Sequence, residues 1–293
     1  MIIGVDAGYY ATKTSEGIIF PSRITTQESI IGDGCSIMIG GKKYTVGEGE
    51  VTVELNKINQ ELTKVCILYA LAKSSDDSEF SIVTGLPVGQ YSKQKDALKN
   101  MLLSSRFNDV QIGNQKRLIL IRDAEIFPQG AGALFSTNIE GEAVLVDIGG
   151  RTVDICLFEM VNGKRKLTKY STILEGTLSL YSKVVHLINS KYETGLKLED
   201  GEKILKSGLE IYGEKQDLSF LKPVIEEHTE AIFKELTLNY PIKTTNVALA
   251  GGGAYLLQGI FQKRIPSSRL IPDAQFANAN GFRKVGESLW QRF

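Results

Sequence analysis

Two stretches of the chain combine an apolar strand, the pattern Asp-x-Gly and a turn of small or polar residues. The first is VDAGYYATK at residues 5–13, and the second is VLVDIGGRTVD at residues 144–154. Each places a carboxylate at the end of a predicted buried strand, two residues before a glycine, which has no side chain to cover its backbone. Carboxylate oxygens suit Mg²⁺, and bare amides suit phosphate oxygens. The repeated pattern predicts two facing hairpins that hold a metal-bound polyphosphate from both sides.

Charged residues beyond each turn add to this chemistry. Lys13 lies seven residues after Asp6, across the predicted hairpin, where an ammonium group would neutralise a β- or γ-phosphate. The second stretch carries an additional acid, Asp154, after Asp147. A purely structural interpretation is also open, because Asp-x-Gly is ordinary turn chemistry and Lys13 fits an exposed strand position. The duplication favours the functional interpretation.

Other phosphate-binding patterns fit poorly. Neither turn matches GxxxxGK[ST] or runs directly into a helix, which argues against the P-loop and dinucleotide-binding folds. A third glycine run, Gly251, Gly252 and Gly253, follows an apolar strand and precedes a helix that begins near Tyr255. It is either a plain strand-to-helix turn or a bare surface on which a base and ribose lie against backbone.

A polar stretch, DAEIFPQ at residues 123–129, precedes a small-residue helix at 130–135. Glu125 and Gln129 are both candidates for orienting an attacking water. In the structural alternative, Glu125 complements a helix dipole and Gln129 is an ordinary first-turn residue.

The sequence offers no covalent nucleophile. No serine or cysteine is paired with histidine in a recognisable pattern. His186 and His228 lie in predicted helices without a partner at metal-ligand spacing, so we expect surface or core roles for both.

The elements that would position these candidate residues recur in the two halves of the chain. Periodicity predicts strands within 2–20, a small β-rich insertion to residue 54, helices at 54–73 and 92–103, and strands at 80–86, 110–112 and 118–121. The second half restarts with a strand at 143–147, a hairpin at 148–159, a strand at 167–173, a helical block at 177–239, a strand at 246–250 and a helix at 280–290. A repeat of about half the chain indicates two related domains around a cleft.

Composition excludes several classes of partner. The chain has 293 residues with 34 basic and 34 acidic side chains, so net charge gives no reason to expect nucleic acid or an anionic membrane as a direct partner. Its three cysteines, Cys35, Cys66 and Cys156, form neither a metal pair nor a disulfide framework. No signal peptide or membrane-spanning stretch is apparent. We therefore expect a cytoplasmic protein.

Five segments, taken in order, resemble the actin-like ATPase superfamily, and most closely the ParM and Alp types of bacterial plasmid-segregation actin. They are residues 6–13, 128–133 (PQGAGA), 147–154, 250–254 (AGGGA) and 276–282 (FANANGF), and TGLP at 84–87 is also similar to a piece common in ParM-type chains. Each match is short, but together they span nearly the whole chain.

The resemblance implies an α/β fold of two duplicated RNase-H-like domains, with ATP and Mg²⁺ in the cleft between them. Domain I would comprise residues 1–137 and 275–293, with 22–54 as a small β-rich subdomain IB. Domain II would comprise residues 138–274, with 177–243 as a helical subdomain IIB.

The resemblance also assigns roles. Asp6 and Asp147 would hold Mg²⁺ through water, and Gln129, in the position of an actin glutamine, would place the attacking water with Asp154 nearby. The phosphate-binding residues would be Gly8, Tyr9, Tyr10, Ala11, Lys13, Gly149, Gly150, Arg151 and Thr152, and the adenosine side would comprise Gly176, Glu202, Lys203, Gly251, Gly252, Gly253 and Tyr255. The sequence departs from the family pattern in the bulk of Tyr9 and Tyr10 and in the presence of Arg151. The preference for ATP or GTP is therefore open.

The implied function is a nucleotide-dependent, head-to-tail filament that segregates plasmid DNA through an adaptor protein at the filament ends. Because a neutral Gln129 is a poor base, we expect slow hydrolysis that times assembly. A small-molecule kinase of the same superfamily is the alternative, although Gln129 and the compact 22–54 insertion argue against it. A chaperone or membrane-bound shape protein would need an extension that the sequence lacks.

Overall fold

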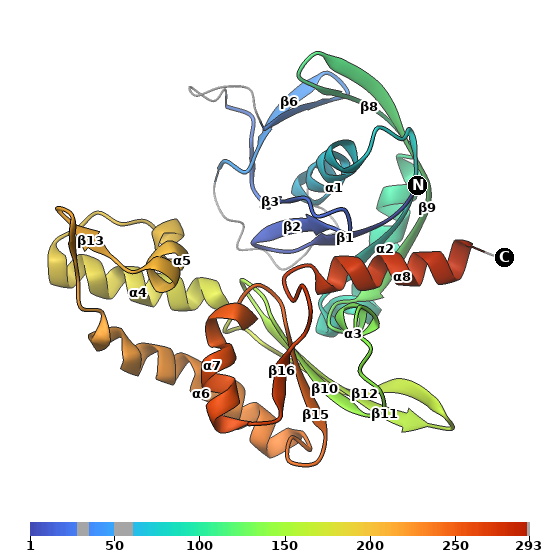
Figure 1. Ribbon diagram of the computed structural model, residues 1–293. Coiled ribbons are helices and arrows are strands. Elements are labelled where there is room, and N and C mark those ends of the chain that lie inside the picture. The colour runs from blue at the N-terminus through green and yellow to red at the C-terminus, as the bar shows by residue number, and fades with distance from the viewer. Residues whose placement is uncertain (28–34, 50–60, 292–293) are drawn as a thin grey trace. The chain divides into compact units, whose positions relative to one another are not determined.

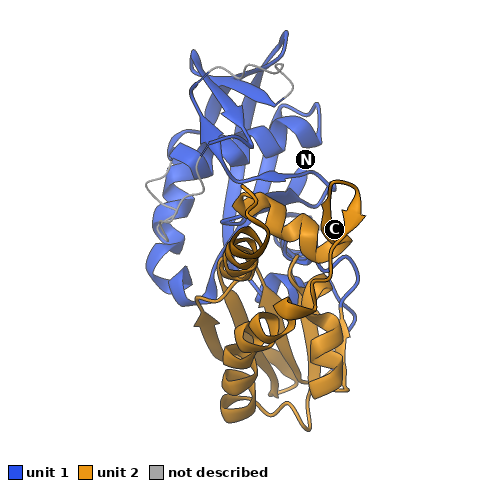
Figure 2. Cartoon of the chain, turned by 90° about the vertical axis from the view of Figure 1, so that its left-hand side faces the viewer, with its two compact units in different colours: residues 1–140, 271–293 blue, residues 141–270 orange. Residues whose placement is uncertain are grey.

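The computed structural model describes residues 1–27, 35–49 and 61–291, and the chain divides into two compact units (Figure 2). Unit 1 comprises Met1–Glu140 and Ile271–Phe293, and unit 2 comprises Gly141–Leu270. Each unit has its own hydrophobic core. The predicted two-domain α/β fold is confirmed. Part of the predicted insertion and the start of the helix expected at 54–73 lie outside the described residues.

Within the described residues, unit 1 is built on a nine-stranded sheet of order β3-β2-β1-β7-β9-β8-β5-β6-β4 (Figure 1). Its strands are β1 (Ile2–Ala7), β2 (Ala11–Thr14), β3 (Ile19–Pro21), β4 (Ile24–Thr25), β5 (Ser36–Ile39), β6 (Lys42–Val46), β7 (Glu79–Leu86), β8 (Phe107–Ile112) and β9 (Gln115–Pro128). The helices are α1 (Glu61–Ser74), α2 (Val88–Ser104), α3 (Ala131–Phe135) and α8 (Ala277–Trp290). The central strands β1, β7 and β9 are parallel, which suits their long buried apolar runs.

Unit 2 repeats the central part of this plan. Its described residues form a five-stranded sheet of order β12-β11-β10-β15-β16, the same arrangement as β3-β2-β1-β7-β9 in unit 1. The strands are β10 (Ala143–Ile148), β11 (Val153–Val161), β12 (Lys164–Ile173), β15 (Asn246–Ala250) and β16 (Ser268–Leu270). The other elements are α4 (Thr177–Tyr192), α5 (Leu198–Ser207), a hairpin of β13 (Glu210–Ile211) and β14 (Glu214–Lys215), η1 (Ser219–Leu221), α6 (Lys222–Asn239) and α7 (Ala254–Arg264). The shared order explains the repeat seen in the sequence.

Several elements differ from the sequence prediction, among them β9, the helical block and α8. Strand β9 continues to Pro128, because residues beyond 121 pair in parallel with β7 after a bulge at Phe80/Ser81. Glu125 therefore lies in a strand, and its interpretation as an acid at a helix N-terminus is wrong. The predicted helical block at 177–239 is interrupted by the β13–β14 hairpin, and α8 begins at Ala277, ahead of the predicted 280.

A histidine lies in the interior of unit 2. The side chain of His228, on α6, is fully buried, with its Nδ1 atom 3.3 Å from a Glu175 carboxylate oxygen. Burial lowers the pKa of His228 and outweighs the opposite effect of Glu175. His228 is thus a neutral core residue, as expected from its sequence setting.

None of the described helices is long and apolar enough to cross a bilayer.

Helix α8 is held in unit 1 by close backbone contacts at glycines. A Cβ atom on Gly281 would overlap the carbonyl oxygen of Gly132 in α3, and one on Gly4 of β1 would overlap that of Ala279. The ring of Phe282 fills the space left by two further glycines, Gly85 and Gly132. These contacts bring α3, α8 and the central strands together where the candidate site lies.

The contact at Gly281 predicts a specific loss of stability. Gly281→Ala should lower the free energy of unfolding by about 1–3 kcal/mol, because backbone atoms must move to admit the methyl group. Gly259→Ala is the matched control, since its helical Cβ in α7 would meet nothing within 4 Å. Urea unfolding measures both variants. Equal midpoints for the two variants would contradict the packing described above.

Candidate functional site

The two Asp-x-Gly hairpins have the same register. In β1–β2, Asp6 pairs with Lys13 and Ala7 with Thr12, so residues 8–11 form the first loop. In β10–β11, Asp147 pairs with Asp154 and Ile148 with Val153, so residues 149–152 form the second loop. Lys13 and Asp154 consequently occupy equivalent positions, each directly opposite the aspartate that ends the first strand of its hairpin.

In unit 1, Asp6 is the centre of a small polar cluster. Its carboxylate is 4% exposed; Oδ2 lies 3.6 Å from Lys13 Nζ, and Oδ1 accepts a hydrogen bond from Gln129 Nε2 at 2.6 Å. Lys13 is itself largely buried, so it is not an exposed strand lysine. A carboxylate only accepts, which requires the amide NH₂ of Gln129 to face Asp6. The carbonyl oxygen of Gln129 is therefore the atom that can accept a hydrogen bond from water.

Backbone contacts hold Gln129 in place. Its N–H donates to Leu86 O at 2.8 Å, and its Cγ would lie only 3.0 Å from a Cβ on Gly85, so glycine makes room for the side chain. On the following residues, Asn278 Oδ1 accepts hydrogen bonds from the N–H groups of Gly130 at 2.9 Å and Ala133 at 3.1 Å. Asn278 thus caps α3 from a distant part of the chain, a role that sequence reasoning missed.

Glu125 is not part of this cluster. It pairs with Val83 across β7–β9, and its Oε2 accepts a hydrogen bond from Lys99 Nζ on α2 at 2.7 Å. The contact between the polar stretch 123–129 and Asp6 is therefore the one made by its last residue, Gln129. Catalysis by Glu125 stays a prediction, while the geometry favours Gln129.

The two tyrosines of the first loop are anchored within unit 1. The Tyr9 side chain is 8% exposed, and its hydroxyl donates to Gln90 Oε1 of α2 at 3.1 Å. Tyr10 accepts a backbone hydrogen bond from Ser22 N at 2.9 Å. The side chain of Tyr9 therefore packs toward α2. The backbone of Tyr9 is the part of this residue that suits a phosphate.

In unit 2, Asp154 is fixed by two hydroxyl groups. Thr172 Oγ1 on β12 donates to Oδ1 at 2.5 Å, and Thr152 Oγ1 donates to Oδ2 at 3.3 Å. Neighbouring Cys156 is buried; burial, with a smaller effect of Asp154 and Asp147, raises the pKa of its thiol well above the usual value. Cys156 is therefore a protonated thiol rather than a nucleophile.

The second loop has its carbonyl groups tied to the start of α4. Gly149 O, Gly150 O and Arg151 O accept hydrogen bonds from the N–H groups of Thr177 at 3.0 Å, Leu178 at 2.7 Å and Gly176 at 3.1 Å, respectively. In a trans peptide the N–H points opposite to the C=O. The N–H groups of residues 150, 151 and 152 therefore point away from α4 together, an arrangement of the kind that suits an anion.

The glycine run 251–253 packs against the end of β10. Gly251 has φ +83°, and a Cβ there would lie 2.5 Å from Asp147 Oδ1. Gly253 N donates to Ile148 O at 3.0 Å, directly before α7. The close approach of Gly251 to Asp147 thus explains why this position is a glycine. A role for residues 251–253 in binding the base stays a prediction.

The remaining predicted residues lie on surface helices. Tyr255, on α7, is 41% exposed. On α5, Lys203 is exposed and Glu202 accepts a hydrogen bond from Lys206 Nζ at 2.6 Å. No contact described here joins Glu202 or Lys203 to the second loop, so their adenosine role stays a prediction.

The two strand-end aspartates fit a hydrated Mg²⁺. Asp6 and Asp147 are buried carboxylates at the ends of β1 and β10, each immediately before a candidate phosphate loop. The bare Gly251 beside Asp147 Oδ1 leaves room that a side chain would fill. Oxygen donors of this kind match the preference of Mg²⁺, which commonly keeps several of its waters.

Comparisons with known proteins agree with this geometry. Residues 4–132 match the family described as "Actin like proteins N terminal domain", and residues 145–263 match "Archaeal actin homologue MreB-like, C-terminal". Among curated proteins, none matches the sequence.

Solved structures are similar over essentially the whole chain. A 15-stranded ParM filament from Clostridium botulinum has 26% identity and a TM-score of 0.80, covering 98% of this chain and 99% of that one. The archaeal actin homologue Ta0583 has 22% identity and a TM-score of 0.83, covering 99% of both chains. Its complex with ADP has 21% identity and a TM-score of 0.81, covering 98% of this chain and 99% of that one. The duplicated sheet order, the paired hairpins and these matches establish that the chain belongs to the actin-like ATPase superfamily.

Proposed function

We propose that this protein binds ATP with Mg²⁺ and assembles into nucleotide-dependent filaments. The observation that carries the proposal is the pair of hairpins in identical register, each with a buried aspartate beside a loop that begins with glycine. The similarity to a ParM filament at 26% identity supports self-assembly, and the ADP complex of an archaeal homologue supports a nucleotide ligand.

Each loop has a defined part in nucleotide binding. The N–H groups of residues 150–152 donate to phosphate oxygens, as do those of the first loop beyond Gly8, whose own N–H donates to Asp6 O at 3.0 Å, and Lys13 neutralises phosphate charge. Asp6 and Asp147 would hold Mg²⁺ through water, and the ion would neutralise phosphate charge there. Gly176, Glu202, Lys203, Gly251–Gly253 and Tyr255 serve the base and ribose. ATP is the proposed nucleotide, with GTP as the competitor to test.

Hydrolysis is an in-line transfer of the γ-phosphoryl group to water. The carbonyl oxygen of Gln129 accepts a hydrogen bond from that water and so orients it, and the oriented carboxylate of Asp154, on the side of the second loop, is the other group placed near the water. Because Gln129 is neutral, positioning rather than strong base catalysis lowers the barrier. The expected rate is slow, which suits a timer for assembly and disassembly.

In the cell, we propose that the filament segregates plasmid DNA in the cytoplasm through a DNA-binding adaptor protein. The balanced net charge supports an indirect contact with DNA. The kinase alternative needs a carboxylate base beside an acceptor hydroxyl. Its nearest candidate in the polar stretch before α3, Glu125, is already paired with Lys99.

The first prediction of this proposal concerns assembly. Light scattering and pelleting with ATP and Mg²⁺ should show polymer, whereas samples with ADP or with the metal chelated should show little. GTP in the same assay measures the nucleotide preference. A protein that stays monomeric with every nucleotide while it phosphorylates a small molecule would instead support the kinase.

The second prediction concerns hydrolysis. Gln129→Ala should reduce phosphate release from assembled protein by about 10²-fold, the scale of a misplaced reacting group, and should still allow ATP-dependent assembly. Glu125→Gln is the matched comparison, and it should hydrolyse at nearly the normal rate. If Glu125→Gln shows the larger loss, the two assignments are reversed.

A further inference from the structure

A tyrosine at the tip of the β13–β14 hairpin is unusual in two respects. Tyr212 has φ 51°, in the left-handed region, followed by Gly213 at φ 83°. Two-residue turns of this kind favour asparagine, aspartate or glycine, so an aromatic residue there is costly. Its side chain is also fully exposed, at 103%. Neither turn geometry nor burial within the chain accounts for this tyrosine.

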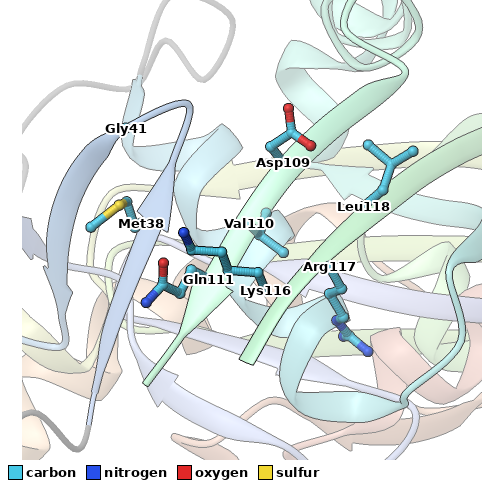
Figure 3. Close-up of a pocket in the computed structure, with 8 residues that line it drawn as sticks. All are labelled: Met38, Gly41, Asp109, Val110, Gln111, Lys116, Arg117 and Leu118. Carbon is cyan, nitrogen blue, oxygen red and sulfur yellow. The ribbon is translucent and has the colours of Figure 1, made fainter. Parts of the chain in front are cut away.

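A groove on unit 1 offers a complementary surface. It has a volume of about 460 Å³ and lies over β5, β8 and β9 (Figure 3), on the face of the sheet that carries Met38, Gln111 and Lys116. The lining residues are Met38, Gly41, Asp109, Val110, Gln111, Lys116, Arg117 and Leu118. The register places Asp109 opposite Leu118 and Gln111 between Met38 and Lys116. Leu118 is 43% exposed, and Phe107, next along this face, is 69% exposed.

We propose that the Tyr212 tip of one copy docks into this groove on a second copy of the chain. The proposal rests on the filament function and names one contact within it. A tyrosine ring supplies a large apolar surface for Met38 and Leu118, while its hydroxyl can bond to the amide of Gln111. The groove volume falls within the range of about 300–1,000 Å³ that ligand pockets span.

The charges of the two surfaces are complementary. The groove carries two cations, Lys116 and Arg117, and one acid, Asp109. The hairpin carries two acids, Glu210 and Glu214, and one cation, Lys215, and all three are exposed. Arg117 is held by Ser75 O at 2.7 Å. Lys116 is therefore the cation best able to reach a carboxylate of the docked hairpin.

The contact is heterologous, because the tip and the groove are different surfaces of the same chain. Such contacts repeat from copy to copy and build an open chain rather than a closed dimer, unless the rotation closes a ring. A central aromatic residue in a pocket is the usual energetic anchor of an interface. Loss of Tyr212 should consequently weaken assembly far more than loss of another exposed tyrosine.

The first test is Tyr212→Asn, which suits the left-handed turn and so preserves the hairpin. The critical concentration for ATP-dependent polymer should rise by about tenfold or more, while binding of a fluorescent ATP analogue stays unchanged. Tyr170→Thr is the control, since Tyr170 is 49% exposed on β12. Equal assembly by Tyr212→Asn and the wild type, or equal losses in both variants, would overturn the inference.

The second test exchanges charges. Lys116→Glu and Glu214→Lys should each impair assembly, and the double variant should recover it. A double variant no better than either single variant contradicts the contact while leaving the filament function intact. If the wild-type protein forms no polymer with any nucleotide, the filament function fails and the docking contact falls with it.

Discussion

The candidate site depends on one constraint of antiparallel pairing. A four-residue loop between two antiparallel strands places the residue seven positions after the aspartate directly opposite it. In unit 1 that residue is Lys13, and in unit 2 it is Asp154. The same backbone therefore presents a cation beside one aspartate and a second acid beside the other. In the proposed function, the duplicated fold thereby supplies two different halves of a phosphoryl-transfer site.

The surrounding structure serves to hold these pairs. Glycines let α8 approach β1 and α3, and Asn278 caps the helix that follows Gln129. In unit 2, the start of α4 binds three carbonyl groups of the second loop and turns its amides in one direction. Such preorganised dipoles stabilise phosphate charge without further rearrangement, which is how electrostatic catalysis gains most of its effect.

The sequence was sufficient for those parts of the site that depend on local pattern. The strand–Asp-x-Gly–strand motif predicted both hairpins, and spacing alone placed Lys13 across from Asp6. The contacts of Gln129 with Asp6, Asn278 with α3 and Thr172 with Asp154 were not predictable. The first two join residues more than a hundred positions apart, and Thr172 lies on a third strand whose register no local signal sets. The sequence did not predict the extension of β9 to Pro128. The composition of this segment resembles a turn, and its strand conformation depends on parallel pairing with β7.

We propose that equivalent positions of the two hairpins have different functions. The most direct test measures equilibrium ATP binding and single-turnover hydrolysis for Lys13→Ala and Asp154→Asn side by side. Loss of Lys13 should weaken binding by about tenfold, the scale of one charge-assisted hydrogen bond. Loss of the Asp154 charge should slow hydrolysis and leave the affinity nearly unchanged. Equal effects of the two variants on both binding and hydrolysis would contradict the claim.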